Sequence, residues 1–160
     1  MSTPPVRTQA DRLNFPGLMP LEVAVLKEWL RLYESQYDRM EYNVRVGQGT
    51  DPGPTYPQNI RDMGIAVTQK RIDAVAWKGN DPTLIEVKNR ATLNAVGQIL
   101  AYKVLFKADN PLLPDPKLLL VASKFDPDVY PVLQSHGVDY VIVAFDPRFI
   151  PPRSFPIPKP

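Results

Sequence analysis

Three ionisable side chains stand on short apolar segments that have strand character. Glu86 and Lys88 are two positions apart in LIEVK and should point to the same side of a strand, while Asp73 lies in the segment RIDAVAW. The turn residues KGND separate the two segments, so an antiparallel hairpin would bring Asp73 beside Glu86. Neighbouring carboxylates repel each other unless one is protonated or a cation lies between them. The pattern therefore predicts a cation site.

The sequence restricts which cation this is. It has no cysteine and a single histidine, so thiolate metal sites are excluded and oxygen ligands remain. A hard divalent ion, Mg²⁺ or Mn²⁺, is commonly held by one or two carboxylates plus waters. Such an ion activates a water and neutralises charge on a phosphate, and the ammonium of Lys88 is placed to orient that water or to stabilise the same charge. These requirements match hydrolysis of a phosphodiester bond.

A polar stripe follows on the next segment. Asn94, Gln98 and Tyr102 are spaced i, i+4 and i+8 on an otherwise apolar helix that Thr92 is expected to cap. Polar groups on a largely buried helix need partners, and the carboxylate end of the sheet offers them. Taken singly, Gln98 and Tyr102 are better interpreted as ordinary residues at the edge of a core, and Asn94 is interpreted as a plain helix residue.

Together these segments resemble a known family. RID at 71–73, IEVK at 85–88 and GQILAY at 97–102 are similar to the motifs of the PD-(D/E)XK nuclease superfamily, and the Gln-x-x-x-Tyr spacing resembles its RecB-like branch. The resemblance covers about residues 20–145. It implies an α/β, restriction-endonuclease-like fold with an αβββαβ core, and Mg²⁺- or Mn²⁺-dependent hydrolysis of DNA. The chain departs from the family name in having Ile72, and not proline, before Asp73.

The resemblance also implies a role for each residue of the first motifs. Asp73 and Glu86 would bind the metal, the backbone carbonyl of Val87 would complete its ligands, and Lys88 would act on the attacking water.

Further roles come from the flanking helices. Gln98 and Tyr102 would position the site or the DNA backbone. The family usually has a metal-facing glutamate on the first helix, and Glu22 fits this role because apolar residues follow it at i+3, i+4 and i+7; Glu28 is the alternative.

Hydrophobic periodicity and turn residues predict the order of elements independently of the resemblance. We expect a helix from Pro20, a turn-rich loop over 47–59, helices over 93–107 and 126–137, and strands at 41–46, 71–77, 83–88, 117–123 and 138–145. Meandering strands followed by helical crossovers predict a mixed central sheet flanked by helices.

Basic residues are frequent in the sequence around the predicted site. They are Arg45, Arg61, Lys70, Arg71, Arg90 and Lys103, with Lys107 nearby. Cations in such positions would contact DNA phosphates without reading sequence. For each residue alone, a solvated charged rim is an equally good interpretation.

The composition fits one domain. With 160 residues, of which 44% are hydrophobic, the chain has enough apolar material for one core, and we divide it into a proline-containing arm (1–19), a nuclease-like domain (20–146) and a proline-rich tail (147–160). A formal net charge of +2 permits nucleic acid as a partner without requiring it. No segment predicts a membrane span or a secretory signal, so a cytoplasmic location is expected, in a host cell or a virion if the protein is phage-encoded.

A second class of function remains open at this point. The proline-rich tails fit docking on neighbouring subunits, as in a structural head-completion or neck component of a virus built on a nuclease-like fold, with or without activity. RNA or a Holliday junction is also compatible as substrate, because the metal and the water do not distinguish these phosphodiesters. The sequence likewise leaves open a homo-oligomer and the choice between endonuclease and exonuclease.

Overall fold

The computed structural model describes residue 15 and residues 17–145 of the chain. Its elements are α1 (Pro20–Tyr33), the 3-10 turn η2 (Glu34–Gln36), β1 (Arg39–Val46), α2 (Gln58–Thr68), β2 (Lys70–Lys78), β3 (Asp81–Ala91), α3 (Leu93–Asp109), β4 (Lys117–Phe125), α4 (Val129–Ser135) and β5 (Asp139–Ile142). The predicted arm and tail lie outside the described residues, apart from positions 15 and 17–19.

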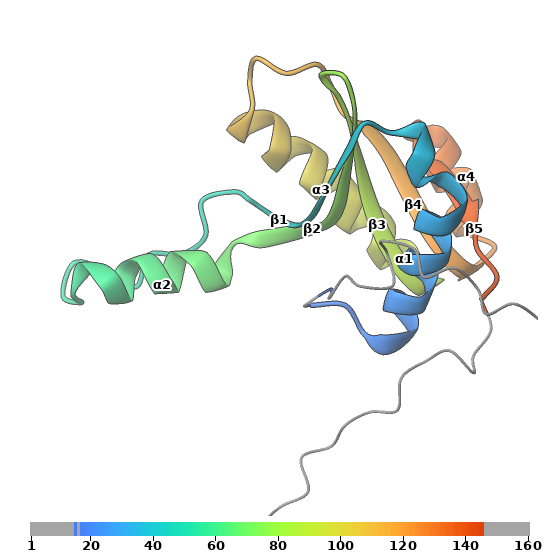
Figure 1. The fold of residues 1–160 in the computed structure, drawn as a ribbon. Helices are drawn as coiled ribbons and strands as arrows, with labels where there is room; N and C mark the ends of the chain where they lie inside the picture. The colour runs from blue at the N-terminus through green and yellow to red at the C-terminus, as the bar shows by residue number, and fades with distance from the viewer. Residues whose placement is uncertain (1–14, 16, 146–160) are drawn as a thin grey trace, which may run out of the picture.

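The strands form one mixed sheet in the order β1-β2-β3-β4-β5 (Figure 1). The first three strands are an antiparallel meander, and β3, β4 and β5 run parallel to one another. Gly79, in the left-handed region at φ 58, forms the tight turn between β2 and β3. Parallel pairing of β3 with β4 requires a crossover, and α3 supplies it.

Helices cover both faces of the sheet, and each face has its own hydrophobic core. Val25, Leu26 and Trp29 of α1 pack on one face with Ile85 and Val87. The opposite face is covered by α3 and α4, whose core residues include Val96, Ile99, Phe106, Val129 and Leu133. The predicted α/β class, a mixed sheet flanked by helices, is therefore confirmed.

Most predicted elements are present with shifted ends. Pro20 begins α1 as expected, because its fixed φ suits the first helical position. The residue Thr92 precedes α3, although its side chain makes no capping hydrogen bond. The last strand is shorter than predicted, with four residues, Asp139–Ile142. No helix among the described residues is both long enough and apolar enough to cross a membrane.

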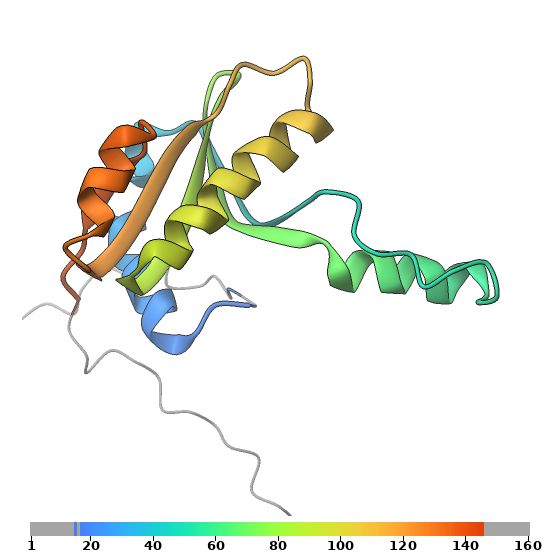
Figure 2. The same cartoon turned by 180° about the vertical axis from the view of Figure 1, so that it is seen from behind.

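Helix α2 was not predicted from the sequence. It forms an arm that projects from the end of the β1–β2 ribbon, and none of its residues is buried (Figures 1 and 2). The loop that precedes it runs back along it: Asp51 accepts a 2.9 Å hydrogen bond from Arg61 Nε, and the backbone N–H of Thr50 donates to Thr68 Oγ1 at 2.6 Å. An 11-residue helix is marginal without such support.

Candidate functional site

The predicted site lies where strands β2 and β3 separate. The two strands pair from Lys78↔Asp81, next to the turn, to Ala74↔Ile85. Asp73 and Glu86 are the next residues beyond the last pair, away from the turn. Asp73 accepts a hydrogen bond on Oδ2 from the backbone N–H of Val87, with a donor–acceptor distance of 2.8 Å. In a regular ladder this N–H of β3 would donate to a main-chain carbonyl of β2, and here the Asp73 carboxylate takes the place of that carbonyl.

Glu86 is the most deeply buried charged residue of the site. Its side chain is 2% exposed, and Oε1 forms an ion pair with Lys88 Nζ at 2.8 Å. The other oxygen, Oε2, is buried without a hydrogen-bond partner. A buried carboxylate oxygen without a partner is costly, so this atom favours a proton or a cation.

The electrostatics of the two carboxyls follow from this burial. Burial, then the charge of Asp73, raises the pKa of Glu86 to about 8, against the opposing effect of Lys88. Burial raises the pKa of Asp73 to about 6, although the Val87 N–H and Lys88 favour its charged form. Near neutral pH the pair therefore holds close to one proton, and a divalent cation would compete for the same place.

Lys88 and Tyr102 stay protonated near neutral pH. Burial of Lys88 disfavours its charge, but the surrounding carboxylates, Glu86 first, outweigh burial and raise the pKa of the ammonium. Tyr102 is 8% exposed, and burial followed by the charges of Glu86 and Asp73 raises the pKa of its hydroxyl, an effect that a hydrogen bond from Gln98 opposes. The structure thus places Tyr102 of α3 near both carboxylates, and Gln98 beside Tyr102.

The residues present fit a small divalent ion. Glu86 Oε2 lacks a partner, Asp73 uses Oδ2 for its hydrogen bond to Val87, and both are hard oxygen donors. Among residues 15 and 17–145 no group of three or more metal-ligating side chains occurs. Any ion here would depend on these two carboxylates, completed by main-chain oxygen and water.

Of the two glutamates considered on α1, Glu22 lies nearer the site. Its charge raises the pKa of both Asp73 and Lys88, whereas Glu28 forms an ion pair with Arg31 at 2.6 Å. Glu22 Oε2 also accepts a 3.0 Å hydrogen bond from the backbone N–H of Met19, which fixes the start of the helix. A role for Glu22 as a metal ligand stays a prediction.

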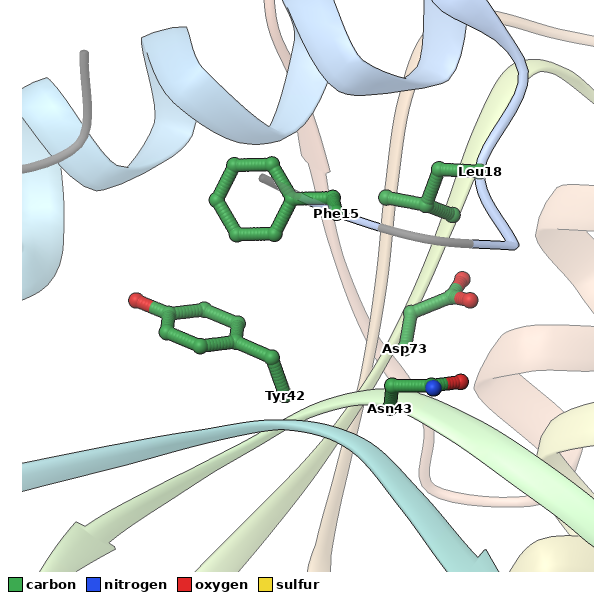
Figure 3. Close-up of a pocket in the computed structure, with 5 residues that line it drawn as sticks. All are labelled: Phe15, Leu18, Tyr42, Asn43 and Asp73. Carbon is green, nitrogen blue, oxygen red and sulfur yellow. The ribbon is translucent and has the colours of Figure 1, made fainter. Parts of the chain in front are cut away.

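A shallow depression opens beside Asp73 on the side of the sheet that α1 covers. Phe15, Leu18, Tyr42 and Asn43 line it together with Asp73, and Figure 3 shows the Asn43 amide and the Asp73 carboxylate beside each other. The ring of Phe15 packs edge-on against Tyr42, with centroids 5.0 Å apart. Sequence reasoning missed Asn43; the available signal was that asparagine tolerates backbone conformations that other residues avoid in strands.

The predicted basic residues divide into two groups, and Lys103 on α3 belongs to neither. Arg61, Arg90 and Lys107 form ion pairs with Asp51, Asp126 and Asp115, respectively.

The other group lies on the β1–β2 ribbon. Arg45 is directly opposite Arg71 near the base of the α2 arm, and Lys70, opposite Val46, follows at the next position on the alternate face of the ribbon. Like charges directly opposite each other destabilise a strand pair, which favours an anion in contact with them. Lys103 is on α3, where its charge acts on Asp115.

Comparisons with known proteins give solved structures of limited similarity and no family. No protein-family model matches the sequence, and no curated protein matches it. The chain is similar to a repair endonuclease from Pyrococcus abyssi (TM-score 0.42, 19% identity, covering 48% of this chain and 34% of that chain). It is also similar to EndoMS in a complex with double-stranded DNA (0.48, 12%, 84% and 49%) and to AF1548, a protein of unknown function (0.45, 15%, 76% and 57%). It spans between a third and somewhat over half of these chains.

Proposed function

We propose that this protein is a nuclease that hydrolyses phosphodiester bonds in DNA with Mg²⁺ or Mn²⁺ at Asp73 and Glu86. The observation that carries the proposal is the buried, partnerless Oε2 of Glu86, next to a second carboxylate and a lysine. Burial leaves close to one proton between the two carboxyls near neutral pH, in a place that a divalent cation would also fill.

Each side chain has a distinct part in the proposed chemistry. The bound ion would neutralise charge on the scissile phosphate and lower the pKa of a water. Asp73 is held in place by the Val87 N–H, and Glu86 Oε2 has no hydrogen-bond donor in the described residues. Lys88 keeps its proton and places a positive Nζ beside the reacting group, where it orients the attacking water or stabilises the developing charge.

Helix α3 supports this arrangement from one side. Because its pKa is raised, Tyr102 remains a neutral hydroxyl that donates or accepts one hydrogen bond, and Gln98 orients it. We assign these two residues to positioning the carboxylates or the DNA backbone. We also propose, from the Gln-x-x-x-Tyr spacing of these two residues, a relation to the RecB-like branch of nucleases.

The proposal is tested by cleavage of a mixed panel of nucleic acids. Linear, circular, single-stranded and branched DNA, with RNA alongside, would be incubated with Mg²⁺ or Mn²⁺ and the wild type, Glu86→Ala or Lys88→Ala. We expect the wild type to cut at least one DNA form, EDTA to stop it, and both variants to be inactive. Cleavage by the variants at the wild-type rate would contradict the site assignment, and a preference for RNA or a junction would redefine the substrate.

The cations of the β1–β2 ribbon give a separate prediction. In Arg45→Ala/Arg71→Ala, we expect DNA affinity to fall by about tenfold or more at moderate salt, because each phosphate contact contributes about 0.9 to the slope of log K against log[salt]. Titrations at several salt concentrations would show a slope shallower by about two, one unit for each arginine. The double variant Arg31→Ala/Lys117→Ala, which removes two exposed cations on α1 and β4, outside the ribbon, is the matched control. Equal slopes for the two double variants would exclude the ribbon as a DNA contact.

A structural role is the competing proposal, including a viral head-completion or neck component. One described feature favours it: the α2 arm exposes Ile60, Met63 and Val67, which lie along one side of a helix without buried residues. A wild type that is inert on the whole panel, and that shows no carboxylate-dependent metal binding in titration calorimetry, would favour this alternative.

A further inference from the structure

The alternation of side chains along β1 reverses at Asn43. In a regular strand, residues 42, 44 and 46 share one face of the sheet. Here Tyr42 packs with the α1-side core, whereas Val44 and Val46 pack with the α3-side core. The two faces have therefore been exchanged within one residue.

The neighbouring strand reverses at the same level. Ala74 and Ala76 belong to the α1-side core, and Ile72 belongs to the α3-side core, so the change in β2 falls at Asp73. The register is the same on both sides of it, because Tyr42 pairs with Ala74 and Val44 pairs with Ile72. No residue is inserted, which distinguishes this feature from a β-bulge.

The reversal in β1 coincides with an unusual backbone conformation at Asn43. Its φ is 53°, and among residues 15 and 17–145 it is the only residue other than glycine with a positive φ. The left-handed region is sterically unfavourable for most L-residues, and asparagine is one of the few that adopt it in single positions. Strained residues of this kind persist where the surrounding structure requires them.

The reversal changes the surroundings of Asp73. At the point of exchange its carboxylate turns into the gap between β2 and β3, where it accepts the hydrogen bond from the Val87 N–H next to Glu86. Asn43 lines the depression beside it (Figure 3), and a Cβ added at Gly17 would lie 3.7 Å from Asn43 Oδ1, so the chain at Gly17 passes closely over it.

We infer that Asn43 is a positioning residue for the carboxylate pair, because its left-handed backbone conformation reverses the β1–β2 ribbon and holds Asp73 against Val87. The arrangement of Asp73 stands on geometry alone; only its importance for catalysis rests on the proposed function. A side chain that cannot adopt a positive φ would restore the regular alternation and withdraw Asp73 from Val87. Glycine, which adopts this conformation freely, would keep the arrangement without the amide.

The test reads the Val87 amide directly, in the full-length protein without metal or DNA. Amide hydrogen exchange followed by NMR would compare the wild type, Asn43→Val, Asn43→Ala and Asn43→Gly, with Asp73→Ala as the reference for a lost acceptor. We expect Val87 to exchange about tenfold faster or more in Asn43→Val and Asp73→Ala, in line with loss of a local hydrogen bond, and at the wild-type rate in Asn43→Gly. Asn43→Ala is the milder variant that decides the question if valine prevents folding.

Two results would overturn the inference: a protected Val87 in the folded valine or alanine variant, or an exposed Val87 in the glycine variant. Cleavage assays on the same proteins separate the inference from the proposed function. If the wild type cuts DNA, glycine should retain most of kcat and alanine or valine should lose it. If the wild type is inert while the exchange pattern holds, the proposed function fails and the positioning role stands.

Discussion

We expect Glu86→Gln to unfold at a higher temperature than the wild type in metal-free buffer at pH 8, and to lose the proposed cleavage of DNA. The reason is the burial of the Glu86 carboxyl, which raises its pKa to about 8 from an ordinary value of 4.5. The folded state therefore binds a proton that the unfolded state releases, and the wild type loses stability as the pH rises from about 4.5 toward 8. Glutamine is neutral at every pH and avoids this loss.

The size of the effect follows from the same linkage. One pKa unit corresponds to about 1.4 kcal/mol, and Glu86→Gln also removes the ion pair with the partly exposed Lys88, so we expect a net gain of about 2 kcal/mol at pH 8. For a protein of this length that is a rise in Tm of roughly 5 °C. Thermal denaturation between pH 5 and pH 8 would show the two proteins converging at the acid end.

Metal and a matched variant complete this experiment. Mg²⁺ should raise the Tm of the wild type at pH 8 by selective binding to the folded state and should leave Glu86→Gln unchanged. Glu28→Gln on α1, which removes an exposed ion pair with Arg31, should melt close to the wild type at both pH values. A glutamine variant that is less stable than the wild type at pH 8 would mean that Glu86 is charged and satisfied in the folded protein.

The second large effect is expected at Lys88. Lys88→Ala should lower kcat by about 10²- to 10⁴-fold, the range seen when a charged group that acts in the transition state is removed. The affinity for DNA should change little, because a single, partly buried ammonium contributes few phosphate contacts. Single-turnover cleavage with saturating enzyme would separate the two quantities.

The hairpin offers a matched control for this substitution. Lys78 is the last residue of β2, at the turn of the hairpin and away from Lys88 on β3. It is exposed and paired with Asp38 at 3.3 Å, so Lys78→Ala should keep full activity. Lys88→Arg tests geometry, since it keeps the charge but replaces a compact ammonium with a planar fork, and partial activity is expected. A Lys88→Ala variant with wild-type kcat would remove Lys88 from the chemistry and leave it only as the partner of Glu86.

The carboxylate pair was predictable because it follows from local rules. Strand periodicity, a tight turn at Gly79 and the spacing of Glu86 and Lys88 are sufficient to place Asp73 beside Glu86. The helix that carries Gln98 and Tyr102 was predictable for the same reason, since its apolar positions recur with a helical period.

What the sequence did not reveal depends on the tertiary arrangement. The segment of α2 contains Gly64 and several β-branched residues, which lower helix propensity, and its support comes from a loop that folds back on it. The partnerless Oε2 of Glu86 depends on how two strands separate, and the reversal at Asn43 depends on a single backbone angle. None of these has a periodic signature along the chain.

The α2 arm begins and ends at neighbouring positions of one hairpin. Val46 and Lys70 are cross-strand partners, and the Gln69 side chain donates to the carbonyl of Gly47 at 2.7 Å, so the ladder is closed at the base of the arm. Topologically the arm is an insertion at a hairpin tip, and its length and sequence can vary without shifting the register of the sheet. Loops of this kind tolerate replacement at little entropic cost. The base of the arm is therefore a natural graft point for a new recognition segment close to the carboxylates.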